Sequence, residues 1–169
     1  MDLDQLAQII DDMAVQHDYP GFEIRSLKMG LPEEVTKSPA RLFADALKHD
    51  NVLVRLAALR WFWENPGRST PFLRIIADRL DDSDEWVRME AIRALERNSK
   101  TDVKTANKIA LRLSDAAAEV RKAAAKGLGK LGHKTDDVVA SLQNATQDED
   151  HEVRWKAEKA LRQLGAYVA

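Results

Sequence analysis

The four histidines are the residues best suited to metal binding or acid–base chemistry in this chain, which contains no cysteine. They are His17, His49, His133 and His151, and none forms a known zinc-binding pattern with a second histidine or a nearby carboxylate. The absence of cysteine excludes disulfides, thiolate catalysis and cysteine-bound zinc. We therefore predict no catalytic residue, no metal site and no cofactor.

Two other patterns have the spacing of catalytic motifs but the wrong context. Adjacent carboxylates such as Asp81-Asp82 fall at predicted helix starts and turns, where negative charge favours a helix N-terminus. Gly127, Gly129 and Gly132 have the spacing of a dinucleotide-binding fingerprint, yet they lie within and at the end of a predicted helix, with no strand before it. Helix capping and helix termination explain both patterns without catalysis.

The dipeptide Val-Arg recurs at a constant interval and indicates the architecture that positions these residues. Its valines are at positions 54, 87, 120 and 153, each 33 residues after the last, and an alanine follows every valine four residues later. A fixed repeat of this length is typical of a solenoid, in which each unit buries its apolar side against its neighbours. Positions within a repeat are numbered below from its valine, as V+n.

Each repeat contains two predicted helices, so we predict an all-α, right-handed α-solenoid of four helical hairpins. In the second repeat, Thr70 is expected to cap the first helix, Pro71 to begin it, and the second helix to run from about Glu85 to Asn98. Asn65-Pro66-Gly67 is expected to end the first repeat. The repeats span about residues 39–67, 68–100, 101–133 and 134–169 and form one continuous domain. Glycines close the third and fourth repeats, Gly132 and Gly165.

Residues 1–38 do not follow the repeat. Apolar residues at helical spacing predict an amphipathic helix that caps the apolar end of the stack over residues 1–17. Pro20-Gly21 and Gly30-Leu31-Pro32 predict an irregular connection, whereas the C-terminal end, residues 166–169, is expected to be less protected. The acidic N-terminus does not resemble a signal peptide and no apolar run approaches the ~20 residues of a membrane span, so a cytoplasmic location is expected.

The repeat pattern Asp-x-x-x-x-Val-Arg-x-x-Ala-x-x-Ala-Leu-x-x-Leu-Gly resembles the short HEAT-like repeats of bacterial proteins, the type named after phycobilisome lyases. The resemblance covers roughly residues 39–165, and the second and third repeats match best. It implies a ladder of ion pairs between repeats, built from loop aspartates and the arginines that follow the valines. The ladder residues are Asp82, Asp115 and Asp148 with Arg88, Arg121 and Arg154; the first repeat departs from the pattern, with His49 at the aspartate position.

Helical geometry predicts one candidate binding surface. It consists of positions V+2, V+6 and V+9 of the second helices, which point away from the buried apolar side of these helices. In HEAT-like stacks this side forms the concave wall. Six of its twelve residues are basic and one is acidic, although the net charge of the chain is −2. The candidate partner-binding residues are Leu56, Arg60, Trp63, Met89, Arg93, Lys122, Lys126, Trp155, Lys159 and Arg162.

Three functions fit this wall, in decreasing order of preference. The first is a non-enzymatic interaction module or scaffold that binds an acidic segment of a protein partner, with Trp155, Met89 and Leu56 as apolar anchors. The second is nucleic-acid binding, because the wall resembles the basic, aromatic-lined DNA cradle of HEAT-like alkylpurine DNA glycosylases. The third is a component of a bilin lyase, which only the resemblance of the repeat type suggests.

Overall fold

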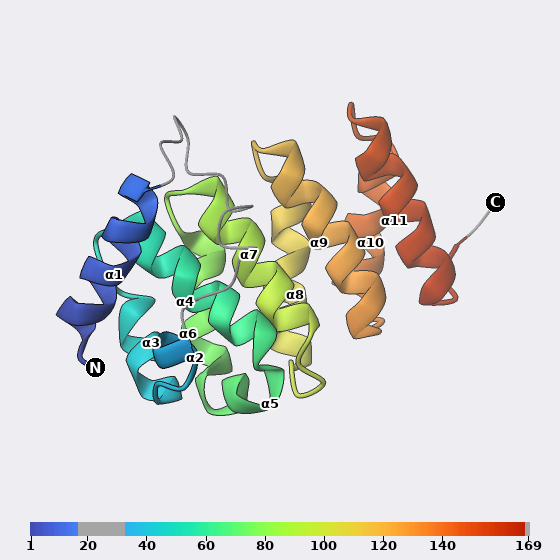
Figure 1. Cartoon of the computed structure of the whole chain (residues 1–169). Coiled ribbons are helices and arrows are strands. Elements are labelled where there is room, and N and C mark those ends of the chain that lie inside the picture. Colours follow the sequence, from blue (N-terminus) through green and yellow to red (C-terminus); the bar gives the residue numbers. More distant parts are fainter. Residues whose placement is uncertain (17–32, 168–169) are drawn as a thin grey trace.

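The chain folds into a stack of helical hairpins, shown by a computed structural model that describes residues 1–16 and 33–167 (Figure 1). All regular elements in these residues are helical, as predicted. The helices are α1 (Leu3–Gln16), α2 (Glu33–Thr36), α3 (Ala40–Ala46), α4 (Val52–Glu64), α5 (Pro66–Ser69), α6 (Leu73–Asp78), α7 (Glu85–Glu96), α8 (Val103–Leu111), α9 (Ala118–Leu131), α10 (Asp136–Ala145) and α11 (His151–Gln163).

Two layers of helices form the stack. The second helices of the repeats, α4, α7, α9 and α11, pack side by side in sequence order, and each also packs on its own first helix, α3, α6, α8 or α10 (Figure 1). The repeat valines and the alanines at V+4 are fully buried between the layers. Small residues at V+4 allow the layers to approach closely, so the constant spacing in the sequence becomes a continuous core.

Side-chain caps and left-handed glycines set the limits of the second helices. Asp84 accepts hydrogen bonds from the Trp86 and Val87 N–H groups, and so caps α7. Gly132 and Gly165 adopt positive φ angles of 75° and 61°, which end α9 and follow α11 as predicted. Only glycine adopts such angles without steric cost, so these two residues define where the third and fourth hairpins end.

The junction between the first two repeats differs from the prediction. Pro66 does not terminate helical structure but begins the short helix α5, and Thr70 makes no capping bond of its own. The reason is a buried amide further along the chain: Asn98 Nδ2 donates to the Pro66 carbonyl at 2.8 Å, to Ser69 Oγ at 2.8 Å and to Thr70 Oγ1 at 3.0 Å. This contact spans about thirty residues of sequence, so local rules could not reveal it.

Helix α1 covers the N-terminal end of the stack. Leu6 and Ile10 are fully buried, and α1 packs on α3 and α4. Asp2 and Gln5 form a reciprocal capping box, in which each side chain accepts the other's backbone N–H at 2.9 Å. The predicted N-terminal helical cap is therefore present, while the predicted connection through Pro20-Gly21 and Gly30-Leu31-Pro32 lies outside the described residues.

Candidate partner-binding surface

An Arg–Asp ladder joins successive repeats and holds the second-helix layer in register. Arg88 reaches Asp115 with Nε and Nη2, both at 2.8 Å, and Arg121 reaches Asp148 in the same way at 2.8 and 2.9 Å. Arg55 Nη2 donates to Asp82 at 2.9 Å. Each arginine therefore pairs with the aspartate of the following repeat. The first repeat does form its pair despite His49, whereas Arg154 pairs with no aspartate among residues 1–16 and 33–167.

The ion pairs of the ladder shift the pKa values of both the aspartates and the arginines. Burial acts to raise the pKa of the Asp115 carboxyl, but hydrogen bonds from Arg88 and from the Ala117 N–H outweigh it, and the pKa lies below its usual value. The pKa of Asp148 is lowered by the same balance, with Arg121 as the donor. Hydrogen bonding to these carboxylates also raises the pKa of both arginines. These pairs thus remain ionised at neutral pH.

The V+6 residues form the exposed line of the second-helix layer, as the sequence suggests. Arg93 and Lys126 expose 43% and 49% of their side chains, and Lys159 is also exposed. Arg60 is less accessible, with 19% of its side chain exposed. These four residues, Arg60, Arg93, Lys126 and Lys159, are called the V+6 line below.

The V+2 residues lie closer to the neighbouring repeat than helical geometry alone predicts. Leu56 and Met89 are only 3% and 5% exposed, so they cannot serve as surface anchors. Lys122, at the same position, reaches Asp150 of the next repeat, with Nζ to Oδ2 at 3.1 Å. The side chains at V+2 are directed toward the following hairpin, which covers them. Trp155 is 55% exposed because no further described repeat follows it.

The V+9 residues are also directed toward the following repeat. A Cβ on Gly129 would lie 3.1 Å from the Cα of Ala160, so glycine allows α9 and α11 to approach closely. This packing role accounts for one glycine of the apparent dinucleotide fingerprint. Glu96 is directed toward the next repeat and accepts Lys130 at 2.7 Å and Lys126 at 3.7 Å. Arg162, in the last repeat, is exposed and pairs with Glu158 at 2.9 Å.

Acidic residues outside the three predicted positions reach the V+6 line, so the surface is less basic than its sequence suggests. Arg60 pairs with Glu64 at 2.8 Å, and Arg93 pairs at 2.7 Å with Glu90, which stands at V+3. Position V+3 faces the preceding helix and was not counted with the wall. Lys122 pairs with Glu119 at 2.9 Å as well as with Asp150, and these two acids raise its pKa to about 12.

At Arg93 and Lys126 the acids lie beneath the bases. The side chains of Glu90 and Glu96 are only 2% and 3% exposed, whereas those of Arg93 and Lys126 are almost half exposed. A molecule approaching Arg93 and Lys126 therefore meets these cations first, whereas Glu119 and Glu152 beside them are themselves 57% and 49% exposed. A groove of about 170 Å³ crosses α7, α9 and α11 beside them, lined by Met89, Arg93, Glu96, Glu119, Lys122, Ala123, Lys126, Glu152 and Lys156.

Two tryptophans flank this surface, each in contact with cations. Trp63 lies between the guanidinium groups of Arg60 and Arg97, at 4.3 and 4.6 Å from its ring centre. Trp155 has the ammonium group of Lys159 5.0 Å above its ring. Cation–π contacts hold these long side chains outward without neutralising their charge. Among the described residues, Lys159 makes no ion pair.

Trp86 was not among the predicted site residues, although it is 43% exposed at the start of α7. It stands at V−1, where the other repeats carry Leu53, Glu119 and Glu152. Because the residue type at V−1 changes from repeat to repeat, the repeat pattern does not predict a binding residue there. An exposed tryptophan is a frequent binding residue, so Trp86 extends the candidate surface toward the loops.

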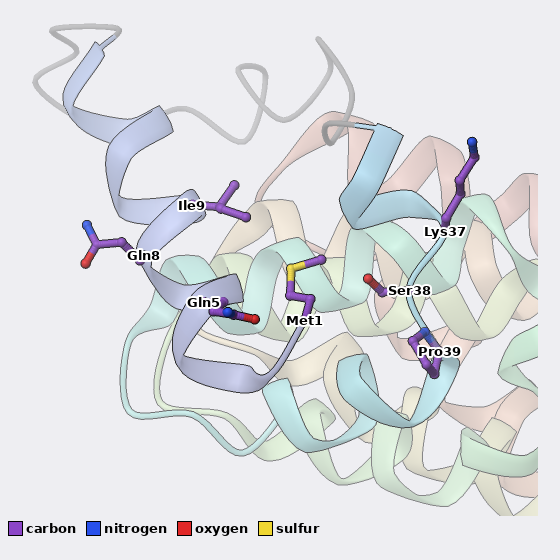
Figure 2. A pocket seen from close by; sticks show the side chains of 7 residues that line it. All are labelled: Met1, Gln5, Gln8, Ile9, Lys37, Ser38 and Pro39. Atoms are coloured by element: carbon purple, nitrogen blue, oxygen red, sulfur yellow. The ribbon is translucent and has the colours of Figure 1, made fainter.

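A separate cavity of about 690 Å³ lies at the N-terminal end, between α1 and the segment that joins α2 to α3 (Figure 2). Its lining residues are Met1, Gln5, Gln8, Ile9, Lys37, Ser38 and Pro39. Lys37 is the one ionisable side chain among them, and it pairs with Glu33 at 2.7 Å. The lining offers no nucleophile–base pair, so it gives no support to catalysis.

The described residues contain neither a cluster of three or more potential metal ligands nor a helix long and apolar enough to cross a membrane. Two of the three described histidines, His49 and His133, make local contacts, and His151 is exposed at the start of α11. His49 Nδ1 accepts the Asn51 N–H at 3.1 Å, and His133 Nε2 lies 2.8 Å from the Thr101 carbonyl. His17 lies outside the described residues.

Comparison with known proteins places this architecture among helical repeat proteins. A family model described as HEAT repeats matches residues 106–169. An engineered protein solved by the Northeast Structural Genomics Consortium has a TM-score of 0.64 at 17% identity, over 99% of this chain and 87% of that one. A designed armadillo repeat protein in complex with the peptide (KR)4 has a TM-score of 0.61 at 16% identity, over 96% of this chain and 91% of that one. No curated protein matches the sequence. These comparisons show that the chain has the fold of a helical repeat solenoid and that residues 106–169 are similar to HEAT repeats.

Proposed function

We propose that the chain is a non-enzymatic interaction module that binds an acidic segment of a protein partner along the V+6 line. The observation that carries this proposal is the exposed row Arg93, Lys126 and Lys159, which ends at the exposed Trp155. The carboxylates that pair with Arg93 and Lys126 are buried. The row crosses three successive repeats, so it suits an extended ligand. Exposed cations next to an exposed tryptophan favour a ligand with both carboxylates and an apolar side chain.

The likeness to a designed armadillo repeat protein that holds the peptide (KR)4 supports the idea that a stack of this shape accommodates an extended peptide. The peptide held by that protein is basic, whereas the V+6 line of this chain is itself basic, so the expected ligand has the opposite charge. Nucleic acid fits less well, because Glu64, Glu90 and Glu96 compensate much of the charge that phosphates would require.

The choice of variant follows from the ion pairs. Reversal of Arg93 would leave the buried Glu90 without its partner and would disturb the fold. Lys126 and Lys159 are better targets, because Lys130 remains on Glu96 when Lys126 is replaced, and Lys159 makes no ion pair among the described residues. A tagged pull-down with the wild type and the Lys126→Glu/Lys159→Glu variant should lose specific acidic partners in the variant. Retention of every wild-type partner would reject the proposed surface.

A further inference from the structure

The arginine at V+1 is held from two sides in each of the inner repeats. Its Nη1 donates to two carbonyls of its own loop, as Arg121 does to Asp115 and Ala116 at 3.0 and 3.2 Å. Its opposite edge binds the carboxylate of the next repeat, through both Nε and Nη2 in Arg88 and Arg121 and through Nη2 alone in Arg55. The loop carbonyls orient the guanidinium, and the aspartate then meets two parallel donors.

Arg154 makes the contacts to its own loop but, among the described residues, no contact to a carboxylate. Its Nη1 donates to the Asp148 and Glu149 carbonyls at 2.7 and 2.9 Å, the same contacts that orient the inner arginines. Within residues 1–16 and 33–167, its Nε and Nη2 have no partner. The last repeat thus presents a bidentate carboxylate-binding edge whose orientation is already fixed.

The residues around Arg154 are suited to reversible docking rather than to a buried repeat interface. Position V+5 carries Leu59, Ile92 and Ala125 in the inner repeats, all fully buried, but Glu158 in the last. Glu158 pairs with Arg162, whose guanidinium lies 4.3 Å from the ring centre of Tyr167. A groove of about 230 Å³ lies on the same side, lined by Gln143, Thr146, Gln147, Glu158, Leu161 and Tyr167.

We propose that this end flank, formed by Arg154, Trp155, Glu158 and Arg162, is a second docking surface that receives an aspartate from the start of a helix of a protein partner. The inner pairs define the chemistry: Asp115 and Asp148 each also accept an N–H from the residue two positions later, at 3.0 and 2.9 Å. The occupant is therefore an aspartate in a loop that turns into a helix, with an apolar contact on Trp155.

A second copy of this chain is a poor occupant. At the corresponding position of its first repeat stands His49, whose Nδ1 is engaged by the Asn51 N–H, and α1 covers that end of the stack. The inference does not depend on the proposed function, because the carboxylate would bind Arg154, which is not part of the V+6 line, although Trp155 borders both surfaces.

The test follows the arginine side-chain Nε–H and tryptophan indole N–H signals by NMR in the full chain labelled with ¹⁵N-arginine and ¹⁵N-tryptophan. The probe is an unlabelled, acetylated and amidated peptide of residues 147–155, which contains the Asp148 loop that Arg121 binds. The Arg154 signal should shift and saturate, together with the indole signal of Trp155. Arg154→Lys should remove the saturable shift, and a peptide with Asp148→Asn should bind about tenfold more weakly, because lysine and asparagine cannot form the bidentate pair.

Three outcomes would overturn the inference. They are no shift at Arg154, equal shifts with the two peptides, or a concentration-dependent shift of Arg154 without any peptide, which would indicate self-association. A shift of Arg93 without a shift of Arg154 would also reject the end flank, yet it would leave the V+6 line and the proposed function intact. A shift of Arg154 without a shift of Arg93 supports the end flank and leaves the V+6 line to be tested by its own variants.

Discussion

At the scale of single residues, the arginine at V+1 connects the repeats, because it satisfies its own loop and the next aspartate together. The Arg88–Asp115 pair is nearly buried, with 14% and 4% of the two side chains exposed. Removal of one member of a buried pair leaves the other charge without compensation, which costs more than the pair itself contributes. The ladder therefore fixes the relative position of neighbouring hairpins.

Replacement of Arg88 by alanine should destabilise the protein by about 3 kcal/mol, because Asp115 would remain buried and unpaired. Arg154→Ala is the matched control, since that arginine makes the loop contacts but no ion pair. The control should cost only about 1 kcal/mol. Urea unfolding of both variants measures the difference, and equal losses would show that the inter-repeat pair is unimportant for stability.

The pKa values of Asp115 and Asp148 predict acid sensitivity. Both are lowered in the folded protein, so their stabilising contribution is complete above the unfolded pKa of about 4 and is lost as the pH falls through the folded value. Urea midpoints measured between about pH 5 and pH 2 should fall with decreasing pH. Asp115→Asn should make this dependence shallower. An unchanged slope would contradict the assignment to the ladder.

At the scale of elements, the second helices pack most closely where residues are smallest. The sequence could predict the hairpins, their glycine stops and the buried alanines, because each follows from local spacing. It could not predict that Asn98 reaches Pro66 and Ser69, or that Lys126 and Lys130 both reach the buried Glu96 of the preceding repeat. Such contacts depend on the rotation of one repeat against the next, which periodicity alone does not define.

Gly129→Ala should destabilise the fold by about 1 kcal/mol, although alanine is ordinarily the better helix residue. The added Cβ would lie 3.1 Å from the Ala160 backbone, which cannot yield as a flexible side chain does. Gly67→Ala is the control, because nothing lies within 4 Å of its Cβ position. Thermal unfolding should rank the control as neutral or more stable. A stabilising effect at Gly129 would mean that α9 and α11 are farther apart.

Overpacking of the V+4 position should also weaken the contact between layers. Ala91 and Ala124 are fully buried, so replacement of either by leucine should cost about 1–3 kcal/mol. The change is read from the shift in the thermal unfolding midpoint. If both variants melt as the wild type does, the inner stripe of these helices has been misassigned.

At the scale of the whole molecule, the two ends of the stack differ. Helix α1 buries Leu6 and Ile10 against the first repeat, whereas the last repeat ends in the polar pair Glu158–Arg162. The sequence indicated the N-terminal cap from its apolar spacing. The sequence predicts that Trp155 is exposed, but for a different reason. In the structure, the V+2 side chains are directed toward the following repeat and not into the centre of the surface.

Deletion of residues 1–16 should expose the apolar end of the first repeat and promote aggregation. Light scattering and the unfolding midpoint measure this effect. Gln8→Ala, on the exposed side of α1, should leave both unchanged. A truncated protein that remains monomeric and equally stable would contradict the capping role of α1.

The affinity for an acidic peptide tests the role of the V+6 line most directly. A peptide of alternating glutamate and aspartate with one central leucine is titrated into the wild type, into Lys126→Glu/Lys159→Glu, and into Lys100→Glu/Lys104→Glu, which makes the same change in net charge at exposed residues of the other layer. The first variant should bind at least about tenfold more weakly, with a reduced salt dependence, and the second about as well as the wild type. Equal affinity of the two variants would show that net charge, and not the V+6 line, determines binding.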